Sequence, residues 1–254
     1  RPLALSQYYG RLSQRLVTAL SALTPEGRLY EIDARLRPSG HSSPLASEVG
    51  GFAEYQNNDA WSWEHMALTR ARVIAGSPEL GGFVAQTIRE VLAKPRDGAK
   101  LVRDVASMRL RIDKKRRTEN LWKLKHVRGG LLDIEFIAQY LELREAARHP
   151  GILSQETGEV FERLAETGII SAVDAADLGA ATRLLRRLQA LLRLTVGVSR
   201  DEKLYPTELR EALAKSAEVG NFDEVRAKLL YTQERVRAYY QRYVQQPADA
   251  AEKE

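Results

Sequence analysis

Residues 28–40 read Arg28-Leu-Tyr-Glu-Ile-Asp-Ala-Arg-Leu-Arg-Pro-Ser-Gly40, and this stretch combines strand periodicity with a dense set of chemically able side chains. Apolar and charged residues alternate from position 30 to position 37, so an extended strand would carry each set on its own face. The charged set is Glu31, Asp33, Arg35 and Arg37. Two carboxylates and two guanidiniums, about 7 Å apart between same-face neighbours, suit a divalent cation bound together with nucleotide phosphates. The proline and glycine that follow are expected to end the strand.

The same alternation has a plainer interpretation. Alternating charge on a strand is most often the solvated face of a half-buried sheet, and the four charges then need no chemical role. From periodicity alone both interpretations stay open.

Composition bounds the class of protein. A chain of 254 residues, 44% of them hydrophobic, can bury one substantial core or two small ones. The formal net charge of +5 permits anionic partners, but no aromatic-plus-basic motif indicates nucleic acid. The absence of cysteine excludes disulfides and thiolate chemistry. No apolar run approaches the roughly 20 residues of a membrane span, and no signal-peptide pattern opens the sequence. We therefore expect a soluble, cytoplasmic protein with no membrane partner.

The segment around the predicted strand reads as helical. Apolar residues at three- and four-residue steps predict an amphipathic helix over residues 5–23, which Thr24-Pro25-Glu26-Gly27 ends. A short helix is expected over 48–58. Asp59 is a plausible N-cap for a further helix over 60–75.

Beyond a predicted domain boundary at Gly76-Ser77-Pro78 the sequence is helical in pattern, and we expect no strand after Leu36. The helices predicted there span 79–93, 98–115, 131–147, 157–167, 172–196, 206–217 and 223–245. Seven helices joined by short connections favour a helical bundle over residues 77–245. The last residues, 246–254, carry a proline and alternating alanines and acids, and we expect a disordered tail.

Two motifs of the predicted bundle carry charge in unusual density. The run Lys114-Lys115-Arg116-Arg117 is interpreted as a solvated helix end, favoured by the helix dipole, rather than a nucleic-acid site. Gly129-Gly130 precedes Leu-Leu-Asp-Ile-Glu-Phe, and glycines let the backbone approach a neighbour closely before a helix starts. Asp133 and Glu135 then fall in the first turn, where the helix dipole favours acids.

Residues 29–40 resemble a signature of the glutamine synthetase adenylyltransferases, bifunctional enzymes that adenylylate and deadenylylate glutamine synthetase. Three further segments resemble the family in the same order and spacing: residues 7–15, Gln-Tyr-Tyr-Gly-Arg-Leu-Ser-Gln-Arg; residues 57–75, with Trp-Ser-Trp-Glu-His at 61–65 and Ala-Leu-Thr-Arg-Ala-Arg-Val at 67–73; and residues 125–136, with Gly-Gly-Leu-Leu-Asp-Ile-Glu-Phe at 129–136. The resemblance thus covers most of residues 7–145.

The family carries two copies of its nucleotidyltransferase unit. The turn Pro38-Ser39-Gly40 and the segment 61–65 look more like the second, adenylylating copy. The deadenylylating copy would more typically carry Pro-Phe-Gly and Asp-Trp-Glu at these places. The resemblance therefore favours the adenylylating half.

The resemblance also implies a fold. The family's catalytic domain resembles DNA polymerase β, and its metal site begins with a Gly-Ser-Asp-x-Asp motif that supplies two of three carboxylates. That motif is absent from the 254 residues. We therefore expect a mainly α chain: a C-terminal fragment with a partial polymerase-β-like nucleotidyltransferase domain over residues 1–76, made of a helix and a β remnant, followed by the α-helical bundle.

The reaction implied by the resemblance moves AMP from ATP to a tyrosine hydroxyl of glutamine synthetase, with two Mg²⁺ ions neutralising charge. Asp33 matches the third carboxylate, which would bind metal and help accept the tyrosyl proton, and Glu31 is a weaker metal candidate. Arg35 and Arg37 would steady phosphates or the strand's register.

The resemblance implies further site residues, most of them within the matching segments. Arg70 and Arg72 are expected to contact phosphates, because guanidinium groups match phosphate geometry. Arg109, Lys125 and Asp133 are expected to line the far wall of a cleft, contributed by the bundle. Asp133 has an alternative role, which is to order the interface with the catalytic domain without touching substrate.

Two functions from different classes are carried forward. The first is an enzyme fragment that is inactive alone, since it lacks two of the expected metal-binding aspartates. The second is an interaction module, in which the helical bundle docks glutamine synthetase or a PII-type signalling protein.

Overall fold

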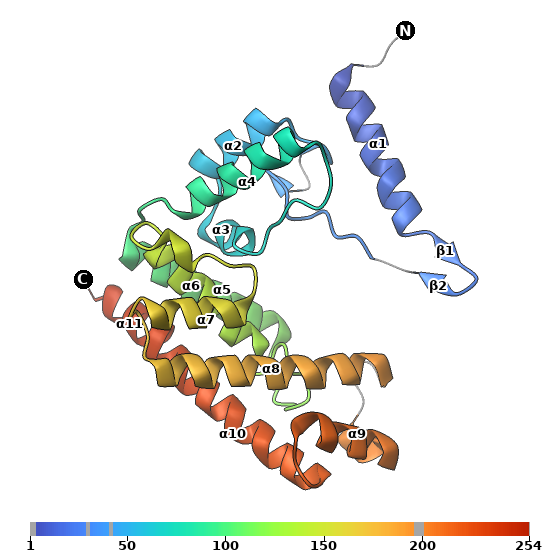
Figure 1. Ribbon diagram of the computed structural model, residues 1–254, viewed down its shortest axis with the longest axis vertical. Coiled ribbons are helices and arrows are strands. Elements are labelled where there is room, and N and C mark those ends of the chain that lie inside the picture. Colours follow the sequence, from blue (N-terminus) through green and yellow to red (C-terminus); the bar gives the residue numbers. More distant parts are fainter. Residues whose placement is uncertain (1–3, 29–30, 41–42, 196–200, 254) are drawn as a thin grey trace.

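A computed structural model describes residues 4–28, 31–40, 43–195 and 201–253. In Figure 1 most of the helices pack into one body, and the N-terminal helix and a small hairpin stand to one side of it. The described residues are mainly helical, as the sequence predicts, and contain a single two-stranded sheet. None of the described helices combines the length and apolar character that a membrane crossing needs.

The N-terminal part consists of helix α1 (Leu5–Leu20) and the antiparallel strands β1 (Leu23–Thr24) and β2 (Gly27–Arg28). Helix α1 follows the predicted amphipathic pattern, but none of its residues is buried. Its large apolar side chains are all exposed: Leu5, Tyr8, Tyr9, Leu12, Leu16 and Leu20.

The prediction of a strand that runs to Arg37 is wrong for residues 31–37, which form no strand. Leu29 and Tyr30 lie outside the described residues. The alternation is overridden by local polar contacts. Asp33 Oδ1 accepts a hydrogen bond from the backbone N–H of Arg35 at 3.0 Å, which closes a turn in place of a strand. The charged side chains therefore do not project together from one strand face.

Three helices follow: α2 (Val49–Asn58), α3 (Ser62–Leu68) and α4 (Pro78–Leu92). The predicted N-cap at Asp59 is wrong, because Asp59 caps the C-terminus of α2 and Trp61 is the N-cap of α3. The carboxylate of Glu64 accepts the backbone N–H of Trp61 at 2.9 Å and so begins the helix there.

Helix α4 follows the predicted boundary at Gly76-Ser77-Pro78, yet it packs against α2 and α3, which precede that boundary. Helix α3 in turn contacts two helices of the bundle, α5 and α6. The division at residue 76 stays a prediction from the sequence.

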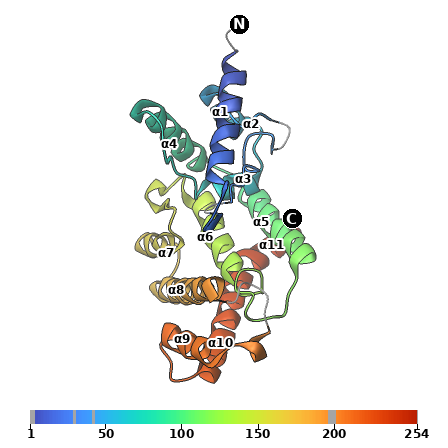
Figure 2. The ribbon, with the colours of Figure 1, turned by 90° about the vertical axis from the view of Figure 1, so that its right-hand side faces the viewer.

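The bundle contains every further helix that the sequence predicts. These are α5 (Gly98–Arg116), α6 (Leu131–Glu145), α7 (Thr157–Glu166), α8 (Ala172–Thr195), α9 (Thr207–Ala217) and α10 (Phe222–Tyr240), with short 3₁₀ turns at Pro150–Ile152 and Glu202–Leu204. Helices α8, α9 and α10 lie together at one end of the molecule (Figures 1 and 2).

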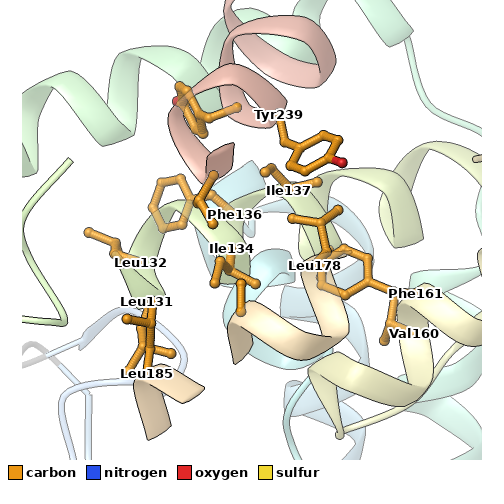
Figure 3. Packing of buried hydrophobic residues seen from close by; sticks show 14 of the residues in the cluster. Leu131, Leu132, Ile134, Phe136, Ile137, Val160, Phe161, Leu178, Leu185 and Tyr239 are labelled. Carbon is orange, nitrogen blue, oxygen red and sulfur yellow. The ribbon is translucent and has the colours of Figure 1, made fainter. Parts of the chain in front are cut away.

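Helix α6 is the centre of the core. It contacts α5, α7, α8 and α10, and most of its residues are buried around its whole circumference. Figure 3 shows Ile134 and Ile137 of α6 among the buried side chains, with Phe161 of α7 and Leu178 of α8 in the same cluster. The motif that the sequence places before this helix is thus anchored by the most buried element.

The disordered tail predicted for residues 246–254 is wrong for its first six residues. After a π-helical turn at Gln241–Gln245, helix α11 spans Gln246–Ala251, and Ala248 and Ala251 are buried. Helix α11 packs against α5, where Arg103 Nη1 donates to the carbonyl of Ala251 at 2.6 Å. Composition misled the prediction, because small alanines allow close packing of helices, and proline is tolerated in a first helical turn.

Glu142 of α6 is expected to make the free energy of unfolding depend on pH. Its side chain is 1% exposed, and burial raises its pKa from 4.5 to about 8, although the backbone N–H of Ser154 donates to it at 3.1 Å. Between these two pH values the folded chain holds a proton that the unfolded chain has lost. The free energy of unfolding should therefore fall, by on the order of a few kcal/mol, as pH rises from about 4.5 to about 8.

Glu142→Gln tests this. The variant should match the parent at pH 5 and exceed its free energy of unfolding at pH 8, as measured by urea unfolding at both values. Glu156→Gln, at an exposed position, is the control and should show no such pH-dependent difference. An equal difference between variant and parent at both pH values would contradict the burial argument.

Candidate functional site

The two candidate metal-binding carboxylates lie in one surface hollow of about 280 Å³, but each has an arginine partner. Asp33 accepts from Arg35 Nε at 2.8 Å, and these side chains are 55% and 69% exposed. Hydrogen bonding to Asp33 raises the pKa of the Arg35 guanidinium. Glu31 lies 3.7 Å from Arg28. The hollow thus offers two carboxylates already compensated by cations.

A magnesium site does not form from these residues alone. No group of three or more histidine, cysteine or acidic residues within the described part of the chain could hold a metal ion. Magnesium takes oxygen ligands in near-octahedral geometry, which two ion-paired carboxylates on an open surface do not supply. This chain contributes Asp33 as one candidate ligand.

Arg37 and Arg72 share a second hollow, of about 260 Å³, between the loop after residue 36 and α4. The Nε–H of Arg37 donates a hydrogen bond to the carbonyl of Ser43 at 3.2 Å, and its Nη1 donates to the carbonyl of Ala34. Arg37 therefore stabilises its own loop. Arg72 is exposed. The structure therefore brings together two of the four arginines expected to contact phosphate.

Arg70 joins two segments that are far apart in the sequence. Its guanidinium pairs with Glu135 of α6 at 2.8 Å, and the two side chains are 40% and 22% exposed. Arg70 follows α3 and Glu135 lies in the motif that starts α6, so the pair ties the first group of helices to the bundle. The sequence predicts Glu135 in the first turn of a helix, whereas in α6 it lies just beyond that turn, and nothing local to it indicates a partner 65 residues earlier.

Arg109 and Asp133 lie inside the bundle and do not line an open cleft. Both side chains are 1% exposed, and Arg109 Nε donates to Asp133 at 2.5 Å. Asp133 also accepts the backbone N–H of Gly129 at 2.5 Å, and Arg109 reaches Asp113 at 3.3 Å. The geometry supports a structural role for the pair, linking α5 to the start of α6.

The glycines before α6 allow the close approach that the sequence indicates. Gly129 has φ +80° and lies against the backbone of α10, where a Cβ atom would stand 1.9 Å from the carbonyl oxygen of Gln233. At Gly130 a Cβ atom would stand 2.4 Å from the carbonyl oxygen of Leu124. The position of Asp133 in the first turn of α6 is confirmed.

Lys125 lies apart from the other candidate residues, in a pocket of about 310 Å³ lined by basic side chains. The candidates are therefore distributed. Asp33 and Glu31 share one hollow, Arg37 and Arg72 share another, and the buried pair belongs to the core.

Two family models cover the chain. Residues 1–86 match the model described as glutamate-ammonia ligase adenylyltransferase, and residues 100–244 match the model described as GlnD PII-uridylyltransferase. The chain is therefore of the adenylyl- and uridylyltransferase class, and its helical bundle corresponds to the second match.

Sequence similarity to individual proteins narrows the class. The chain is 44% identical over 253 residues to the bifunctional glutamine synthetase adenylyltransferase/adenylyl-removing enzyme of Xanthobacter autotrophicus, covering 98% of this chain and 25% of the relative. It is 42% identical over 244 residues to the enzyme of that name from Rhodopseudomonas palustris, covering 96% of this chain and 25% of the relative. The chain belongs to the glutamine synthetase adenylyltransferase family, and it spans about a quarter of the length of these relatives.

Proposed function

We propose that this chain is part of an enzyme that transfers AMP from ATP to a tyrosine of glutamine synthetase, and that it comes from the adenylylating half. The observation that carries the proposal is the 44% identity to a bifunctional adenylyltransferase along 253 residues. The match of residues 29–40 and 61–65 to the second nucleotidyltransferase copy supports the choice of half.

Asp33 is the proposed catalytic residue and metal ligand, with Glu31 as the weaker second ligand. Magnesium and ATP belong to the proposal for the longer protein, in which the ion would neutralise charge on the phosphates. Arg35 holds the carboxylate of Asp33 in place, as its hydrogen bonds at 2.8 Å support. Arg37 and Arg72 are proposed to bind phosphate together, because they share one hollow.

We expect the 254-residue chain alone to transfer no AMP, because its sequence contains no Gly-Ser-Asp-x-Asp motif. In a longer protein that includes this motif, Asp33→Asn should lower the rate about 100- to 1,000-fold, the usual cost of losing one group that stabilises transition-state charge. The measurement is transfer of label from α-labelled ATP to purified glutamine synthetase.

Glu54→Gln, at an exposed position on α2, is the matched control and should retain the parent's rate. Labelled glutamine synthetase in a reaction with the 254-residue chain alone would contradict the proposal that this chain is inactive. A full rate with Asp33→Asn would remove Asp33 from the mechanism.

The second candidate function is docking of glutamine synthetase or a PII-type signalling protein by the bundle. It is favoured by a groove of about 570 Å³ between α8 and α10 that has an apolar floor and charges of both signs on its wall, where Arg187 pairs with Glu218 and Arg235 pairs with Asp177. Such a surface suits a partner that offers an apolar contact and complementary charges. Retention of either purified protein by the immobilised chain, without AMP transfer, would favour docking over catalysis.

A further inference from the structure

The pocket that contains Lys125 is unusual in its charge. It lies between the C-terminal ends of α5 and α8 and the loop that leads to α6, and its volume is about 310 Å³. Four permanent cations line it: Arg116, Lys123, Lys125 and Arg193. No aspartate or glutamate of the described residues lines it. We refer to it as the basic pocket.

The cations of the basic pocket have no ion-pair partner among the described residues. Glu202, which accepts a hydrogen bond from the indole of Trp122 in the pocket wall, has its other oxygen 3.4 Å from Arg226. Burial raises the pKa of the Tyr205 hydroxyl at one side of the pocket, and the charges of the nearby Glu202 and Asp201 raise it further. These two acids offset the four cations only in part.

His126, which also lines the basic pocket, is affected by the same positive charge. Its Nε2 lies 3.3 Å from Arg116 Nη1, and because a guanidinium only donates, Nε2 is the acceptor. The neutral ring then carries its hydrogen on Nδ1, which is buried without a partner among the described residues. Burial lowers the pKa of His126, and the charges of Arg116, Lys125, Arg109 and Lys123 lower it further.

Helix dipoles explain only part of this arrangement. Arg193 lies in the last turn of α8 and Arg116 in the last turn of α5, where cations interact favourably with the partial negative charge of a helix end. Lys123 and Lys125 lie in the loop between α5 and α6 and have no such explanation. Four like charges around one hollow repel one another unless an anion joins them.

We propose that the basic pocket binds an anion with two or more linked phosphates, either free pyrophosphate or the phosphate tail of a nucleotide. Arginine forks contact phosphate oxygens in pairs, lysines add point charges, and four cations match a polyanion better than a single carboxylate. This inference goes beyond the proposed transfer reaction, because of the four cations only Lys125 belongs to the site that the family resemblance implies.

The test is calorimetric titration of the 254-residue chain with sodium pyrophosphate at constant ionic strength. One saturable site is expected. Arg193→Gln and Arg116→Gln should each weaken binding about fivefold or more, which corresponds to about 1 kcal/mol. Lys114→Gln removes one charge from the same end of α5 but lies outside the pocket, and should change the affinity less than about twofold.

Competition tests whether linked phosphates are what the pocket binds, and the relative affinities of ATP and pyrophosphate distinguish a nucleotide tail from the free anion. ATP should compete with pyrophosphate, and AMP, with a single phosphate, should not. Absence of saturable binding, or an equal loss of affinity in all three variants, would overturn the site. Binding of ATP that pyrophosphate does not displace would also overturn it. Because the readout is binding, its failure is distinguishable from failure of AMP transfer. Thermal unfolding of each variant confirms that it is folded.

Discussion

Gly129→Ala is expected to destabilise the bundle by about 3 kcal/mol or more. The added Cβ atom would stand 1.9 Å from the carbonyl oxygen of Gln233, which is far inside van der Waals contact and involves backbone that cannot rotate away. The residue would also have to keep φ near +80°, which an L-residue rarely adopts. Because this glycine seats α6 against α10, the clash must push apart two helices of the core.

The measurement is the urea midpoint followed by circular dichroism, with Gly158→Ala as the matched control. Gly158 lies in the first turn of α7, and a Cβ atom added there would meet no atom within 4 Å, so its replacement should be neutral or stabilising by up to about 1 kcal/mol. If Gly129→Ala unfolds at the parent's midpoint, α10 does not lie against the Gly129 loop in solution.

Asp133→Ala is expected to cost about 3–5 kcal/mol, because it leaves the charge of Arg109 buried without its main partner. Both side chains are 1% exposed, and the substitution also removes the acceptor of the Gly129 N–H. Asp113, at 3.3 Å from Arg109, compensates only in part. The loss should appear in urea unfolding as a lower midpoint with an unchanged slope.

The double variant Arg109→Met/Asp133→Ala separates a buried pair from two independent residues. If the pair acts as a unit, the double variant loses less stability than the sum of the single variants, since no unpaired charge remains. Glu156→Gln, which breaks an ion pair on the surface, is the reference and should cost about 1 kcal/mol or less. Strictly additive losses would show that Arg109 and Asp133 contribute separately.

The helices were predictable because the spacing of apolar residues indicates which face of a helix packs against the core. In α8 the buried side chains include Leu184, Leu185 and Leu188, while Arg183 and Arg187 are exposed, as the interleaved pattern indicates. Helix ends were less predictable. Asp59 looks like an N-cap in sequence, yet the next helix begins two residues later because Glu64 bonds the backbone of Trp61.

The segment from Glu31 to Arg37 was not predictable from its alternation. A strand needs a neighbour to bond its edge groups, and alternation carries no information on whether one is there. Among the described residues the sheet ends at Arg28, and the contact of Asp33 with Arg35 supplies a local alternative. The prediction for the C-terminal residues failed in the other direction. Their composition suggested disorder, but Ala248 and Ala251 pack in a helix against α5.

The sequence also could not predict which of the candidate site residues lie close together in space. Sequence similarity places Arg70, Lys125 and Asp133 on family motifs, but it does not say which side chains meet. The structure pairs Arg70 with Glu135 and buries Arg109 with Asp133. It also brings Lys125 into the same pocket as Arg193, which lies 68 residues later in the sequence. Such contacts arise from the packing of distant helices.

The contact between α5 and α11 makes the first and last helices of the bundle neighbours. A terminal helix that packs only on its neighbour in sequence can detach while the remainder stays intact, but α11 also covers a helix from the start of the bundle. Detachment of α11 would uncover α5 and break the bond from Arg103 to Ala251 at the same time. We therefore expect α11 to unfold together with α5 rather than to fray by itself.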